Sequence, residues 1–130
     1  MEKHNMIFQY LSLLTANEED KVLFVLLLIA IAMIVDFVTG TIAAIVREDR
    51  EFRSKKGING ILRKIASMLL LIFFLPCSML IPEGMGIALV YTMYIGYLIM
   101  EIKSIVENVG KNGTDVTLFQ EFIKRLSGGK

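Results

Sequence analysis

This chain has little of the chemistry from which protein active sites are built. Cys77 is its only cysteine and His4 its only histidine, so an intrachain disulfide is excluded and a His/Cys metal site cannot be assembled. The net charge of +1 offers nothing that would attract nucleic acid. No histidine stands near an acid, and there is no nucleophile elbow and no glycine-rich phosphate loop. We therefore expect no enzyme, no catalytic or metal-binding residue and no cofactor.

The amino-terminal end also lacks the features of a secretory signal peptide. Met6–Leu14 is a short apolar patch, but acids follow it where a signal peptide would carry small residues and a cleavage site. Asn5–Ala16 places Ile7, Leu11 and Leu14 on one face, which is typical of a short amphipathic helix at a membrane surface. A disordered tail is the alternative interpretation of this segment.

Long apolar segments dominate what is present. Hydrophobic residues make up 55% of the chain and the mean hydropathy is +0.61, whereas soluble domains are about 45–50% apolar. Val22–Val46 contains a single charge, Asp36, and both Ile65–Pro82 and Gly84–Met100 contain none. A soluble bundle needs polar outer faces on its helices, and these segments have none. The sequence predicts an all-α integral membrane protein, with a soluble domain of buried helices as the alternative.

We expect one membrane domain, residues 1–130, built on three transmembrane helices. The predicted elements are the amphipathic helix at 5–16, transmembrane helices at 22–46, 61–81 and 86–106, and a tail at 107–130 that holds a short helix, Leu118–Leu126. Asn17 and the acids after it are predicted to cap the first long helix. Pro76 is expected to bend the second helix, and Pro82–Gly84 to turn the chain into the third.

Basic residues are distributed unevenly between the connections. The connection between the second and third predicted helices has none. The connection between the first two is rich in them: Arg47, Arg50, Arg53, Lys55, Lys56, Arg63 and Lys64. By the positive-inside rule this connection and the tail are cytoplasmic, and the amino terminus and the Pro82 turn face outward. Setting the topology would by itself account for these residues, and the interleaved acids argue against a simple lipid-binding tract.

Asp36 lies in the middle of the longest apolar segment. A carboxylate near the bilayer centre costs about 2.5–3.5 kcal/mol on insertion scales, so it is expected to face another helix or a wet cavity. Asp36 shares a row at helical spacing with Ala32, Gly40 and Ala44. Small residues let membrane helices approach closely, so the row predicts helix association. It could join two copies of the chain or pack within one.

The third predicted helix carries a second polar row, formed by Tyr94, Tyr97, Glu101, Ser104 and Asn108. Tyrosines and late acids often lie at the headgroup level, and this interfacial interpretation fits Asn108 well but Tyr94 poorly. The two rows could bury each other in a monomer or line a wet surface in an oligomer, and the sequence leaves both open.

Several short motifs follow one another along the chain. They are Asp36-Phe37-Val38-Thr39-Gly40, Ser54-Lys55-Lys56-Gly57, Gly60-Ile61-Leu62-Arg63-Lys64 and Glu101-Ile102-Lys103-Ser104-Ile105-Val106-Glu107-Asn108, followed by Gly110 and Gly113. In this order the motifs resemble the toxin-secretion/phage-lysis holin family. The resemblance covers about Val22 to Leu126. Two departures are the missing acid at the end of the second helix, where Pro76 and Pro82 stand, and the missing proline segment after the last glycine.

The resemblance implies a non-enzymatic protein that needs no cofactor and accumulates in the bacterial cytoplasmic membrane as a multi-pass protein. Its partners would be membrane lipid and copies of itself, assembled into a lesion that releases an endolysin or a large toxin. Two alternatives remain: a small ion channel or transporter subunit in which Asp36 and Glu101 form an ion pathway, and a non-conducting membrane adaptor that binds a partner through the basic connection and the tail.

Overall fold

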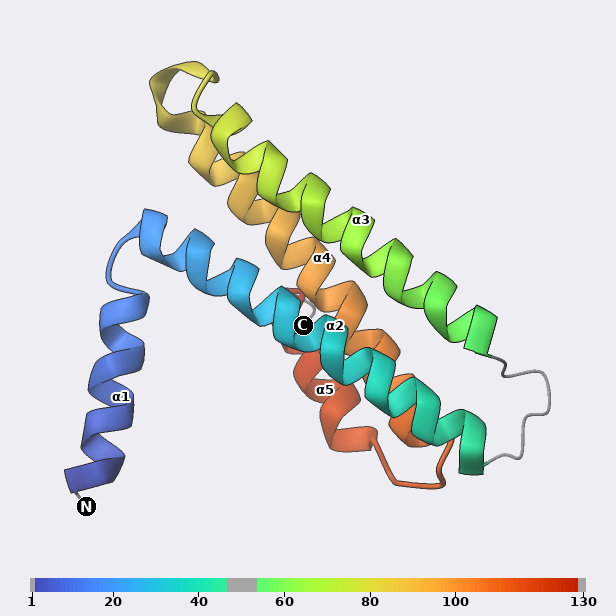
Figure 1. Ribbon diagram of the computed structural model, residues 1–130. Coiled ribbons are helices and arrows are strands. Elements are labelled where there is room, and N and C mark those ends of the chain that lie inside the picture. Colours follow the sequence, from blue (N-terminus) through green and yellow to red (C-terminus); the bar gives the residue numbers. More distant parts are fainter. Residues whose placement is uncertain (1, 47–53, 129–130) are drawn as a thin grey trace.

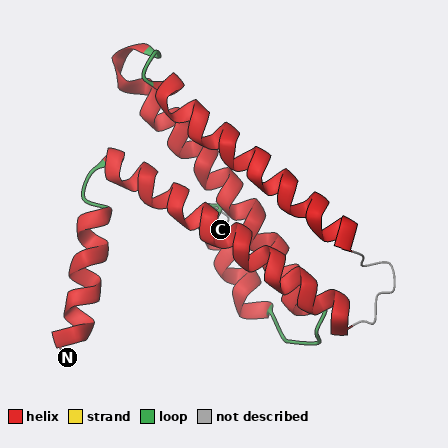
Figure 2. Cartoon of the chain, viewed as in Figure 1, coloured by secondary structure: helices red, strands yellow, loops and turns green. Residues whose placement is uncertain are grey.

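The protein is a bundle of helices joined by short loops (Figure 2). The computed structural model describes residues 2–46 and 54–128, and within these ranges it contains helices and loops only. The elements are α1 (Glu2–Leu14), α2 (Glu18–Val46), α3 (Ser54–Ser78), the 3₁₀ turn η1 (Pro82–Gly84), α4 (Met85–Gly110) and α5 (Thr117–Leu126). Figure 1 shows α2, α3 and α4 as long neighbouring rods, with α1 projecting from the start of α2.

Three of the described helical segments are long and apolar enough to cross a membrane. They are Glu18–Val46, Lys56–Ser78 and Pro82–Gly110. The predicted fold class, an all-α membrane protein with three transmembrane helices, is confirmed. The predicted cap of the first long helix is also confirmed, because the Asn17 side-chain oxygen accepts a bond of 2.8 Å from the Asp20 backbone N–H.

The hydrophobic core lies mainly between α2 and α4. Val25, Ile29 and Ala32 of α2 are buried against Val90, Tyr94 and Leu98 of α4. On both helices these residues recur at spacings of three or four, so each helix presents one continuous stripe to the other. The α2–α4 pair is therefore the most closely packed part of the chain.

Helix α3 lies beside α4 (Figure 1) but contributes much less to the core. Leu71 is its one apolar residue that the described structure buries in the core cluster, whereas Leu69, Leu70 and Phe73 are exposed. The Tyr94 hydroxyl of α4 donates a hydrogen bond to the Leu71 carbonyl. Most of the surface of α3 is thus free to face lipid.

A tight hairpin joins α3 to α4. Pro76 lies in the last turn of α3, and the chain then continues with three successive i→i−3 bonds to Ile81. Gly86, in the first turn of α4, lies against the backbone of Ser78, so that a Cβ atom at Gly86 would come within 2.7 Å of the Ser78 carbonyl carbon. Only a residue without a side chain allows the two helices to approach this closely.

Some residues that the sequence analysis placed in connections lie within helices in the structure. Helix α3 begins at Ser54 rather than near Ile61. Lys55, Lys56, Arg63 and Lys64, assigned to the first connection, therefore lie within α3. Lysine and arginine are good helix formers, so a cluster of them does not by itself end a helix. Arg47, Arg50 and Arg53 lie outside the described residues.

Candidate functional site

A cluster of polar side chains joins the three long helices. Lys64 of α3 lies between Asp36 of α2 and Glu101 of α4. Its Nζ donates to Asp36 Oδ2 at 2.7 Å and to Glu101 Oε2 and Oε1 at 3.0 and 3.3 Å. One ammonium group thus bridges two carboxylates that are 65 residues apart in the sequence (101 minus 36).

Asn108 of α4 binds the other side of Asp36. Its Nδ2 donates to Asp36 Oδ1 at 2.9 Å and to the Asp36 carbonyl oxygen at 3.2 Å. The same nitrogen lies 3.1 Å from Thr39 Oγ1, another acceptor in reach. Both carboxylate oxygens of Asp36 therefore have partners, as a partly buried charge requires.

The cluster is shielded from solvent but is not sealed. The side chains of Glu101, Asp36 and Lys64 are 10%, 13% and 23% exposed. If all three are ionised, two negative charges and one positive charge leave a net charge of −1. Asp36 lies ten residues before the end of α2 and Glu101 nine before the end of α4, which corresponds to about 15 Å at 1.5 Å per residue. The cluster thus lies within the membrane-spanning length, toward the end where α2 and α4 finish.

The two acids that the sequence analysis singled out are brought together, but the basic partner was missed. Lys64 was assigned to a topology-setting loop, whereas it lies inside α3 and bonds to both acids. A signal was available, because a charge inside a membrane span usually pairs with another. Lys64 is the last basic residue before the uncharged segment that starts at Ile65.

The row of small residues on α2 faces α4 within the chain. Ala32 is 7% exposed. A Cβ atom at Gly40 would lie 3.4 Å from Asn108 Nδ2, and Ala44 is half-buried. Ala32 and Gly40 thus pack within the chain, and association between copies stays a prediction. Close packing by small residues is what allows Asn108 to reach Asp36.

The remaining polar residues of α4 are placed differently from one another. Tyr94 is fully buried and binds α3. Tyr97 and Ser104 are half-buried, and within the described ranges no hydrogen bond connects either of them to the cluster. Only Glu101 and Asn108 of the predicted row are therefore part of the cluster.

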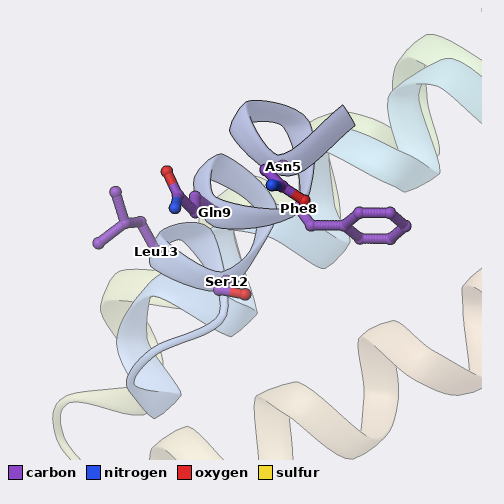
Figure 3. Close-up of a pocket in the computed structure, with 5 residues that line it drawn as sticks. All are labelled: Asn5, Phe8, Gln9, Ser12 and Leu13. Carbon is purple, nitrogen blue, oxygen red and sulfur yellow. The ribbon is translucent and has the colours of Figure 1, made fainter. Parts of the chain in front are cut away.

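Two other features of the described residues do not form a comparable site. Among the described residues, no group of three histidine, cysteine or acidic side chains could hold a metal ion. The hollow in Figure 3 is lined by Asn5, Phe8, Gln9, Ser12 and Leu13, all from the single helix α1. It is a depression along one helix, without polar groups converging from several elements.

A small all-α protein with three membrane-spanning helices and an ion-paired cluster between them belongs to the multi-pass membrane proteins. The sequence model of the bacteriophage holin family matches residues 16–128, and the chain belongs to this family. It is therefore a holin-type membrane protein of phage lysis, as the resemblance implied.

The relatives of this chain include three proteins named antiholin. Those of Bacillus phages phi29 and PZA are each 30% identical to it over 115 residues, which cover 86% of this chain and 86% of the relative. The antiholin of Bacillus phage B103 is 30% identical over 89 residues, covering 68% of this chain and 66% of the relative. No solved structure matches the chain.

Proposed function

We propose that this chain assembles with copies of itself in the bacterial cytoplasmic membrane and forms the lesion that releases a phage endolysin. The observation that carries the proposal is the ion-paired cluster of Asp36, Lys64 and Glu101 inside the membrane-spanning helices. Charged groups at this depth are costly to insert and mark a functional site by default. A simple anchor needs none of them.

The weak attachment of α3 provides a route from monomer to assembly. Lys64 reaches the acids from α3, which of the three long helices has the smallest share in the core. Its other attachments include the packing of Leu71, the hydrogen bond that the Leu71 carbonyl accepts from Tyr94, and the close approach of Ser78 to Gly86 at the far end of the helix. If α3 moves away, Asp36 and Glu101 lose their cation, and Lys64 of a neighbouring copy can replace it. Exchange of identical elements between copies is a low-cost route to an oligomer.

The same exchange would create a wet surface. With all three groups ionised the cluster carries a net charge of −1, and it is already partly exposed. In a ring of copies the acids, with Thr39 and Asn108, would face the lumen rather than lipid, where water satisfies them. The proposed orientation follows the basic residues, with the amino terminus and Pro82–Gly84 outside and the connection at 47–53 and the tail in the cytoplasm.

A second candidate function is that of an antiholin, favoured by the names of the three relatives. A chain with this role would oppose the lesion rather than form it. The pairing of Lys64 with both acids within one chain suits a protein that remains monomeric, or that joins a holin assembly without forming a lesion.

Inducible expression in bacterial cells that contain cytoplasmic reporters of graded size would test both functions. A lesion-forming holin releases an endolysin-sized protein abruptly after a lag. A larger reporter, of the size of a large toxin, tests whether the lesion would also release a toxin. Release of ions alone would indicate a channel, and no release an adaptor or an antiholin. An antiholin would also delay release by a co-expressed holin, whereas an adaptor would not. Release of ions alone, or no release at all, contradicts the lesion-forming proposal.

A further inference from the structure

The carboxy-terminal helix α5 presents an apolar face that the described chain does not cover. Leu118, Phe119, Phe122 and Leu126 lie on one side of this ten-residue helix and are 84%, 57%, 62% and 40% exposed. Ile123, at the edge of this side, is the only residue of α5 that is buried. The opposite side carries Gln120, Glu121 and Lys124, and Arg125 borders the apolar face beside Leu118.

Helix α5 does not extend away from the membrane-spanning helices but returns along α4. The chain turns after Gly110, where a Cβ atom would lie 3.6 Å from Val116, and Gly113 adopts a positive φ of 86°. Ile123 and Ser127 then line a hollow together with Lys103 and Glu107 of α4. Lys103 is seven residues before the end of α4, so α5 lies beside about the last 10 Å of a membrane-spanning helix.

The protein itself provides little to keep α5 helical. A free helix of fewer than about 12–15 residues is marginal in water, and one buried isoleucine is a small anchor. The start of the helix is stabilised locally, since Asp115 Oδ1 accepts bonds from the Thr117 backbone N–H at 3.0 Å and from its hydroxyl at 2.6 Å. The exposed pair of Glu121 and Arg125, 3.6 Å apart, adds little, so burial of the exposed apolar face is the main stabilisation that remains.

The basic residues near α5 indicate what covers that face. Lys124 and Arg125 lie in its last turn, and Lys103 and Lys111 lie at the adjacent end of α4. Helix α2 ends and helix α3 begins at this same end of the molecule (Figure 1), and the first turn of α3 contains Lys55 and Lys56. Amphipathic helices with this combination bind the headgroup region of membranes, and basic residues near the surface favour anionic lipids.

We infer that α5 is a lipid-docking helix that inserts Leu118, Phe119 and Phe122 into the anionic leaflet beside the end of α4. The occupant of the face is lipid rather than a second copy or a soluble protein, because α5 is held at the depth of the last turns of a membrane span. The inference depends on the membrane-spanning fold and not on whether the chain forms a lesion.

The absence of tryptophan from the chain allows a direct test with single-tryptophan variants. Phe122→Trp places the probe on the apolar face, and Glu121→Trp is the matched control on the polar face. The full-length variants are reconstituted into vesicles of phosphatidylcholine and phosphatidylglycerol, with or without dibrominated phosphatidylcholine. We expect blue-shifted emission from position 122 and quenching by brominated lipid at least twofold stronger than at position 121.

Three outcomes would overturn the inference. Equal, weak quenching with water-like emission at both positions would show that the face lies in water. Blue-shifted emission at position 122 without quenching by brominated lipid would show that protein covers it. Quenching that is the same without phosphatidylglycerol would remove the preference for an anionic leaflet.

Discussion

Replacing Lys64 with methionine removes the ammonium group that bridges Asp36 and Glu101 while preserving most of the side-chain volume. The two carboxylates, 13% and 10% exposed, would then face each other across α2 and α4 without a cation. Removing one partner of a buried ion pair costs about 3–5 kcal/mol. Because the Lys64 side chain is 23% exposed, we expect the lower value, about 3 kcal/mol.

The substitution destabilises the state in which α3 is docked on the α2–α4 pair, because Lys64 is the charged link between α3 and these two helices. At 1.4 kcal/mol per factor of ten, a loss of about 3 kcal/mol raises the undocked population by about 100-fold. Leu71 is buried when α3 is docked. A cysteine at position 71, in a background without the native Cys77, should therefore react with N-ethylmaleimide at least tenfold faster in the purified Lys64→Met protein.

The matched control is Lys56→Met, which removes an exposed lysine from the same helix and should leave the labelling rate unchanged. Combining Lys64→Met with Asp36→Asn and Glu101→Gln removes the unpaired carboxylates and should restore slow labelling. Equal labelling rates in Lys64→Met and Lys56→Met would refute the view that Lys64 holds α3 in place.

Three further outcomes are expected. Gly86→Ala should separate the α3–α4 hairpin and destabilise the protein by about 1–3 kcal/mol, measured by SDS titration in mixed micelles. Gly96 has open space at its Cβ, so Gly96→Ala should leave the stability unchanged. Equal unfolding midpoints for the two variants would contradict the close approach of Gly86 to Ser78. The bonds from Thr117 hold the pKa of Asp115 below its ordinary value, so they stabilise α5 at neutral pH and are lost as the pH falls through that lowered pKa. Tryptophan emission from α5 should then shift toward the red on acidification, and a pH profile unchanged by Asp115→Ala would remove this role. Finally, in cells a membrane-impermeant thiol reagent should label a cysteine at position 83 but not one at position 56, and the reverse would invert the topology.

The sequence by itself determined that the long apolar segments are helical, and it marked the rows of polar and small residues on the first and third of them. In a bilayer, an apolar segment of this length satisfies its backbone hydrogen bonds by forming a helix. Asn17, Pro82 and Gly84 mark helix ends through local backbone chemistry. The cost of a carboxylate in an apolar segment also singled out Asp36 without any structure, and the polar row of the third helix singled out Glu101. These are local properties, encoded within a few turns of chain.

Only the tertiary structure decided which groups meet. Periodicity places Asp36 on a face of α2, but the partner of that face depends on the register of helices joined through separate connections. Lys64 pairs with both acids because α3 starts at Ser54 and lies beside α4 at that height, and Asn108 reaches Asp36 because Gly40 leaves room. Hydrogen bonds of about 3 Å require positions set to within a fraction of a helical turn, and no pattern along one helix contains that information.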